Sequence, residues 1–174
     1  MSSVVISGDT SGAITLAAPA VAGTNTATLP AATGTVMVSG NMPAFSYYQS
    51  VQQTLSGATF TKITFTTSEF DTTNGMYASS RFTPTIAGYY QVSFGLSPGA
   101  SATSQITSLY KNGSQFKTPY YITSASSAQS AGSVLVYFNG STDYVEVYGW
   151  FLNGQVTSNT NYYTYFQAAM VRGA

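Results

Sequence analysis

The chain has 174 residues, of which 44% are hydrophobic and only 6% are charged, and its five basic and five acidic residues give a net charge of zero. A nucleic-acid-binding protein needs clustered Lys and Arg, so this composition excludes that class. Because the chain has no His and no Cys, Ser-His-Asp catalysis, His-ligated zinc, thiol catalysis and a disulfide framework are excluded as well.

Residues 1–43 differ in composition from the rest of the chain. Residues 1–40 contain no aromatic residue, and their apolar residues form short pieces such as Ile14-Thr15-Leu16. Such pieces are too short to bury a core of their own. We therefore predict an extended N-terminal segment that needs copies of itself or another protein to become ordered. We find no signal peptide and no run near the ~20 apolar residues of a membrane helix, so we expect no membrane insertion.

Alternating apolar and polar residues predict strands throughout residues 44–174. In the clearest strand, Tyr89–Leu96, the residues Tyr90, Val92, Phe94 and Leu96 share one face. Further strands are predicted at Phe45–Val51, Thr61–Thr67, Ile106–Lys111, Val134–Asn139, Tyr144–Leu152 and Tyr162–Arg172. Asn-Gly pairs at 74–75, 112–113, 139–140 and 153–154 indicate turns that favour a positive φ. This pattern indicates an all-β sandwich or barrel.

Two of the predicted strands, Tyr144–Leu152 and Tyr162–Val171, carry apolar residues on both faces. An antiparallel strand that is buried on both faces usually has a core on one side and another subunit on the other. The alternative is that a loop covers the second face. We predict self-association, without deciding which face of the last strands is core. The predicted interface residues are Tyr148, Tyr162, Tyr163, Tyr165, Phe166 and Met170.

Residues 81–97, RFTPTIAGYYQVSFGLS, resemble the central motif of the globular head of the complement first-component recognition protein, in the tumour-necrosis-factor-like superfamily. The motif's Phe, Pro, Ala-Gly-Tyr-Tyr and alternating strand match Phe82, Pro84, Ala87, Gly88, Tyr89, Tyr90, Val92 and Phe94. Weaker similarities follow in the family's order: SLYKNGSQF at 108–116, VLVYFNGSTDYVEVYGWF at 134–151 and YTYFQAAMV at 163–171. The resemblance covers roughly residues 44–174.

This resemblance implies a jelly-roll β-sandwich of the tumour-necrosis-factor-like type, which assembles as a homotrimer and binds rather than catalyses. The animal proteins carry collagen stalks, whereas this chain has no Gly-X-Y repeat. Instead, residues 12–40, GAITLAAPAVAGTNTATLPAATGTVMVSG, are similar to a short segment that recurs in phage tail-fibre and other virion proteins. We therefore expect residues 1–43 to attach to tail or capsid proteins and residues 44–174 to form the trimeric head.

The resulting hypothesis is a short trimeric tail fibre, made in the host cytoplasm and located in the phage particle, that binds the host cell surface. One alternative is a capsid decoration or fibre-adaptor protein without a receptor, and another is a bacterial surface protein of the same fold. We expect no enzymatic activity, no cofactor and no metal. Glu69 and Asp71 are expected to be solvated acids beside the Asn74-Gly75 turn rather than ligands, and no metal is expected at Asp143 and Glu146, which lie near another turn.

Tyrosine pairs are the best candidates for ligand contact. Tyr120 and Tyr121 lie in the polar stretch Gln115–Gly132, which we expect to be a surface loop. Aromatic faces stack on sugar rings, and a chain so poor in charge has few ion pairs to offer a charged polymer. We therefore expect a neutral host surface glycan as the receptor, with Tyr120 and Tyr121 in contact with it, and we expect Trp150 to lie in the core.

Overall fold

The structure is a computed structural model that describes residues 3–28, 31, 33–34, 36–123 and 128–174. It consists of two compact units, Met1–Gly34 and Thr35–Ala174, and we call the second unit the head. The regular elements are β1 (Ser3–Ser7), β2 (Ala13–Ala17), the 3-10 helix η1 (Ser39–Asn41), β3 (Ala44–Tyr48), β4 (Thr54–Leu55), β5 (Thr61–Lys62), β6 (Thr67–Asp71), β7 (Tyr77–Ala78), β8 (Arg81–Phe82), β9 (Gly88–Leu96), β10 (Ser104–Lys111), β11 (Ser114–Thr123), β12 (Ser130–Phe138), β13 (Val145–Phe151), β14 (Gln155–Val156) and β15 (Tyr165–Gly173). Among the described residues, no helix is long and apolar enough to cross a membrane.

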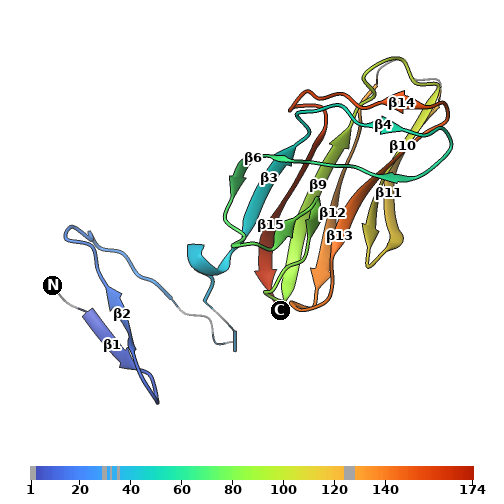
Figure 1. The fold of residues 1–174 in the computed structure, drawn as a ribbon. Coiled ribbons are helices and arrows are strands. Elements are labelled where there is room, and N and C mark those ends of the chain that lie inside the picture. Colours follow the sequence, from blue (N-terminus) through green and yellow to red (C-terminus); the bar gives the residue numbers. More distant parts are fainter. Residues whose placement is uncertain (1–2, 29–30, 32, 35, 124–127) are drawn as a thin grey trace. The chain divides into compact units, whose positions relative to one another are not determined.

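The head is a sandwich of two antiparallel β-sheets (Figure 1). One sheet has the strand order β12-β9-β15-β3-β6. The other has the order β11-β10-β13-β8-β7, with β5 also paired to β13. The last strand, β15, lies between β9 and β3, so strands far apart in the sequence become neighbours. Such connections are typical of jelly rolls, and the predicted all-β sandwich is confirmed.

Strand alternation builds the core between the two sheets. On β9 the side chains of Tyr90, Val92, Phe94 and Leu96 are fully buried, as the sequence predicts. Phe82 of β8 packs across the sandwich, with its ring centroid 5.4 Å from that of Tyr90. Other fully buried side chains are those of Phe45, Leu55, Ile63, Leu109, Phe138, Val145, Val147, Phe151 and Phe166. The alternate residues of each strand therefore face away from the core.

The strand predicted at 61–67 is interrupted, because side chains take over its backbone hydrogen bonds. Regular pairing stops at Lys62 and resumes at Thr67. Between them, the Gln53 side chain accepts from Thr64 N at 3.0 Å and donates to Lys62 O at 2.8 Å. The Ser80 hydroxyl accepts from Phe65 N at 2.8 Å. Ile63 N still donates to Val147 O of β13 at 2.9 Å, but side chains rather than a neighbouring strand satisfy the backbone N–H groups of Thr64 and Phe65.

The prediction of a surface loop at 115–132 is largely wrong. Ser114–Thr123 is strand β11, which pairs with β10, and β12 begins at Ser130. Residues 124–127, the centre of the expected loop, lie outside the described residues. β11 is at the edge of its sheet and nearly all of it is exposed, so its polar composition imitates that of a loop.

The four Asn-Gly pairs adopt different conformations. Asn74-Gly75 and Asn112-Gly113 have positive φ at both residues, as the sequence predicts. In the pair at 139–140, only Gly140 has a positive φ, of 73°. The Asn139 side chain there accepts hydrogen bonds from the backbone of Ser141 and from the two residues after it. The pair at 153–154 has no positive φ.

Residues 36–43, which the composition groups with the extended N-terminal segment, pack on the head. Met37 contacts the head's buried cluster, and Pro43 is buried, with its carbonyl oxygen accepting a hydrogen bond from Met170 N at 3.1 Å. The segment that is structurally separate therefore ends at Gly34.

Candidate functional site: the outer face of the five-stranded sheet

The five-stranded sheet turns one side to the core and the other, which we call the outer face, away from it. Residues of five strands lie side by side on this face in a transverse row. From β12 to β6, the row consists of Ser133, Ser93, Gln167, Ser46 and Phe70. The outer face is therefore a continuous surface formed by both early and late parts of the sequence.

The three serines of this row are hydrogen-bonded within the chain. The hydroxyl oxygens of Ser93 and Ser133 lie 2.6 Å apart, and Gln91 Nε2 donates to Ser133 Oγ at 2.7 Å. The Ser46 hydroxyl donates to Glu69 Oε2 at 2.7 Å. Because these polar groups are already paired within the chain, covering them costs less than covering polar groups that only water satisfies.

Large apolar side chains surround the polar row. Leu135 and Val171 are each 56% exposed, and Phe70 is 51% exposed. Tyr137 and Tyr89 lie opposite each other on β12 and β9, with ring centroids 5.3 Å apart. Neither β9 nor β12 contains a charged residue. Apart from Glu69, which accepts from Ser46, and Arg172, whose guanidinium lies over the Tyr89 ring, the outer face combines uncharged polar groups with exposed apolar ones. This composition is typical of a protein-protein interface.

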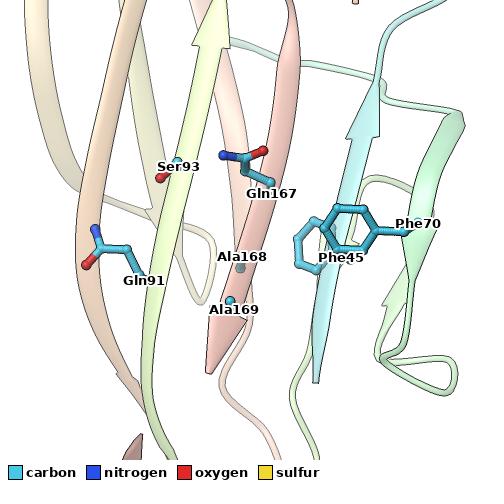
Figure 2. A pocket seen from close by; sticks show the side chains of 7 residues that line it. All are labelled: Phe45, Phe70, Gln91, Ser93, Gln167, Ala168 and Ala169. Atoms are coloured by element: carbon cyan, nitrogen blue, oxygen red, sulfur yellow. The ribbon is translucent and has the colours of Figure 1, made fainter. Parts of the chain in front are cut away.

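A shallow pocket of about 230 Å³ opens on this face (Figure 2). Phe70 lines one side of it, Gln91 and Ser93 of β9 line the other, and Gln167 and Ala169 of β15 lie between them. The core residues Phe45 and Ala168 also border the pocket. The lining contains no acid, base or nucleophile arranged for chemistry, and the volume is below the ~300–1,000 Å³ of typical small-molecule sites. The pocket has the size of a recess for a side chain of a neighbouring protein.

Four of the six predicted interface residues lie at the surface. Tyr165 is half-buried on the outer face, and Tyr162 and Tyr163 are exposed just before β15. Tyr148 lies instead on β13 of the other sheet, where its ring stacks on that of Tyr110 with centroids 4.0 Å apart.

Phe166 and Met170 must be removed from the predicted interface, because they are part of the chain's own core. Phe166 is fully buried and Met170 is 5% exposed. They lie opposite Phe94 and Tyr90 of β9, on the inward side of β15. The core therefore accounts for one apolar face of this strand, and the exposed Val171 belongs to the other.

Sequence reasoning missed Leu135, Tyr137, Tyr89 and Phe70 as outer-face residues. The signal was present in part, because Leu135 and Tyr137 alternate with Val136 and Phe138, which makes β12 apolar on both faces. Pairing of β12 with β9 and of β3 with β6 could not be read from the pattern, and that pairing brings these residues onto one surface.

Tyr120 and Tyr121 do not form one platform. They are neighbours on β11, so their side chains point to opposite sides of the strand. Tyr121 lies opposite Ile106 of β10, and Ile106 lies opposite Trp150 of β13. Trp150 is half-buried and outside the core cluster, so its expected core position is wrong. The result is a transverse row of Tyr121, Ile106 and Trp150 on the outward side of the second sheet, which we call the aromatic row.

The acids are held by separate partners and form no shared site. Glu146 is 3% exposed, and its Oε1 accepts from Lys62 Nζ at 2.6 Å and from Arg81 Nε at 2.9 Å. Burial opposes ionisation of Glu146, but the hydrogen bonds and charges of Lys62 and Arg81 outweigh it and lower the pKa of Glu146. Asp143 is bound by Asn112 and Lys111, whose hydrogen bonds outweigh desolvation and lower its pKa too.

Glu69 and Asp71 are likewise engaged by neighbours. Glu69 accepts from Ser46, and Asp71 accepts from the Tyr47 hydroxyl at 2.9 Å and from Thr73 N at 2.7 Å. In the part of the chain that the structure describes, no three acids lie together in a group that could hold a metal ion.

Comparison with known proteins gives a fold and no family. No protein-family profile matches the sequence, and no curated protein matches it. Among solved structures, the globular domain of zebrafish complement 1qA protein matches with a TM-score of 0.56 at 15% identity, over 76% of this chain and 98% of that one. The head has the jelly-roll fold of the tumour-necrosis-factor and C1q type. Murine APRIL matches this jelly roll with a TM-score of 0.56 at 12% identity, over 75% and 99% of the two chains. Eiger TNF from S. frugiperda matches with a TM-score of 0.56 at 9% identity, over 77% and 95%. These likenesses confirm the fold that residues 81–97 imply.

Proposed function

We propose that the chain is a homotrimeric structural protein of a bacteriophage virion, a short tail fibre whose head binds the host cell surface. The observation that carries this proposal is the outer face. Leu135, Tyr137 and Val171 remain exposed there, around a row whose serines are already hydrogen-bonded within the chain. Exposed apolar surface of this extent is suited to contact with another copy of the chain.

The energetics favour self-association. Burying a few hundred Å² of apolar surface per subunit, at roughly 25 cal/mol per Å², stabilises the assembly by several kcal/mol before the cost of association. Because β9 and β12 carry no charge, facing copies do not bring like charges together there. Three copies are the arrangement implied by the resemblance of residues 81–97 to the tumour-necrosis-factor-like superfamily.

The virion assignment is supported by the N-terminal segment. Residues 12–40 are similar to a segment that recurs in phage tail-fibre and other virion proteins, and residues 1–34 form a unit separate from the head. We infer that this unit attaches the protein to tail or capsid proteins, leaving the head free for the host.

The aromatic row supports a receptor site on the opposite sheet. Tyr121 is 54% exposed, and Trp150 and Ile106 are half-buried beside it, facing away from the core. Aromatic rings at the surface stack on the apolar faces of sugar rings. No member of this row is charged, and on the same sheet Lys62, Arg81 and Glu146 are paired with one another. An uncharged host surface glycan therefore fits the row better than an acidic polymer does.

The test of the virion assignment is to find the protein on particles. Electron cryo-microscopy of the phage that encodes it should show trimeric heads projecting from the tail. Heads on the capsid lattice would favour a decoration protein without a receptor, and heads at the junction of another fibre would favour an adaptor. A chain lacking residues 1–34 should still assemble its heads but be absent from particles. Particles without the intact protein would contradict the virion assignment and favour a bacterial surface protein.

A further inference from the structure

The β1–β2 hairpin carries an apolar face that the other described residues of its own unit leave exposed. The strand register places Val4 opposite Leu16 and Ile6 opposite Ile14, so these four side chains share one face of the hairpin. Their exposed fractions are 61%, 58%, 55% and 67% in that order. On the other face Val5 lies opposite Thr15, and the remaining residues of the two strands are Ser or Ala.

A hairpin of this kind does not hold its structure in water by itself. Two-stranded sheets are at best marginally stable alone, and this one has no aromatic residue and no third strand. Its order therefore depends on a partner that covers the aliphatic face.

We propose that the aliphatic face of β1–β2 packs against the same face of two further copies of this chain, forming a small three-hairpin core in the N-terminal part of the fibre. This inference rests on the homotrimer of the proposed function.

Charge favours copies of the chain as the partner. Asp9 is the single charged residue among residues 1–40, and it lies in the turn between the two strands rather than on the aliphatic face. Three identical faces can therefore meet without bringing like charges together, and aliphatic residues of one type pack well against themselves.

The tether to the head also favours self-packing. The hairpin and the head are joined by residues 18–34, rich in Ala, Gly, Thr and Pro. For a segment of this composition and of about 17 residues, the random-coil relation gives a root-mean-square length of about 20–25 Å. Hairpins attached to one trimeric head would then meet at an effective concentration of about millimolar, at which even a weak contact forms. A separate virion protein has no such advantage before particle assembly.

The test measures the hairpin and the head separately in the full-length protein. Amide hydrogen exchange of residues 3–17 should be slowed at least about 10-fold relative to an unstructured peptide. Ile14→Lys should abolish this protection, and Thr15→Lys, on the opposite face of the same strand, should keep it. Light scattering should give the mass of three chains for all three proteins, because the heads hold them together.

Single cysteines provide a second measurement that does not disrupt the face, since the native chain has no cysteine. Oxidation should cross-link two chains of each trimer in at least one of Val4→Cys, Ile6→Cys, Ile14→Cys and Leu16→Cys, and not in Thr15→Cys. A trimer whose hairpin exchanges freely, or is protected only after particles are added, would overturn self-packing and leave the trimer intact. A monomer would overturn both proposals.

Discussion

Tyr120 and Tyr121 lie on opposite sides of strand β11, although they are adjacent in the sequence. Tyr121 faces the same way as Ile106, opposite it on β10, whereas Tyr120 lies opposite Thr107, which is buried. The two tyrosines are about equally exposed, at 57% and 54%, so they form a matched pair of positions for testing the receptor site.

We predict that Tyr121→Ala and Trp150→Ala weaken adsorption of the purified protein to host cells, whereas Tyr120→Ala does not. Loss of one stacking contact, at about 0.5–1.5 kcal/mol, corresponds to roughly 2- to 10-fold per head and to more when three heads bind together. Adsorption should change little between low and high salt, because the contact is uncharged. Equal losses for Tyr120→Ala and Tyr121→Ala would show that the aromatic row is not the site.

Phe166→Ala should destabilise the head rather than its assembly. The ring is fully buried, 5.1 Å from Phe45 and 5.7 Å from Phe65 between centroids, so its removal leaves a cavity. The expected loss is about 3–5 kcal/mol in the free energy of unfolding, measured by urea denaturation. Val171→Ala, on the exposed side of β15, should cost far less. Similar losses at the two positions would contradict the assignment of Phe166 to the core.

Glu146 should make stability depend on pH in the acidic range. Its pKa is lowered in the folded head, so its contribution is complete above the ordinary value of roughly 4.3 and is lost as the pH falls through the lower value of the folded state. At pH 7, Glu146→Gln should cost about 1–3 kcal/mol, because Lys62 and Arg81 lose their carboxylate partner.

The difference in the free energy of unfolding between the wild type and Glu146→Gln should therefore shrink as the pH is lowered below about 4. Denaturant titrations at pH 7 and pH 3 measure this change. A difference between the two proteins that stays constant across that range would show that the ion cluster is not the cause.

Ala58 and Ser79 are exposed residues with a left-handed backbone that glycine would adopt more easily. Ala58 has φ 52° and Ser79 has φ 50°. Ala58→Gly and Ser79→Gly should each raise the free energy of unfolding by about 0.5–1 kcal/mol. Glycine removes about 1–2 kcal/mol of steric strain from the left-handed backbone, which exceeds the free-energy cost of the greater entropy that glycine gives the unfolded chain. Ala78→Gly, at an exposed strand position without a positive φ, should lower it instead. Thermal unfolding checks all three.

The sequence could predict the sandwich because its central strands alternate without ambiguity. The inward residues of β9 are all buried, and the Asn-Gly turns at 74–75 and 112–113 have the expected backbone. The period of two decides which residues of one strand share a face. Predicting that part of the fold therefore requires no information about distant segments.

Features that depend on contacts with distant parts of the sequence could not be predicted. The backbone near Thr64 is satisfied by Gln53 rather than by a strand, and β11 imitates a loop because it is an exposed edge. The same limit applies to the sites: two apolar faces on the last strand were evident, but only its pairing with β9 shows that the face carrying Phe166 is core.

The central claim, a homotrimer formed through the outer face, is tested most directly by the mass of the protein in solution. Multi-angle light scattering at micromolar concentration should give three times the chain mass of 18.3 kDa. Leu135→Lys, which puts a charge at an outer-face position that is 56% exposed, should reduce this to one chain mass without loss of folding. Leu152→Lys, at a position 50% exposed beyond the end of β13, should leave three chains. A stable wild-type monomer, or a Leu135→Lys protein that remains a trimer, would contradict the account.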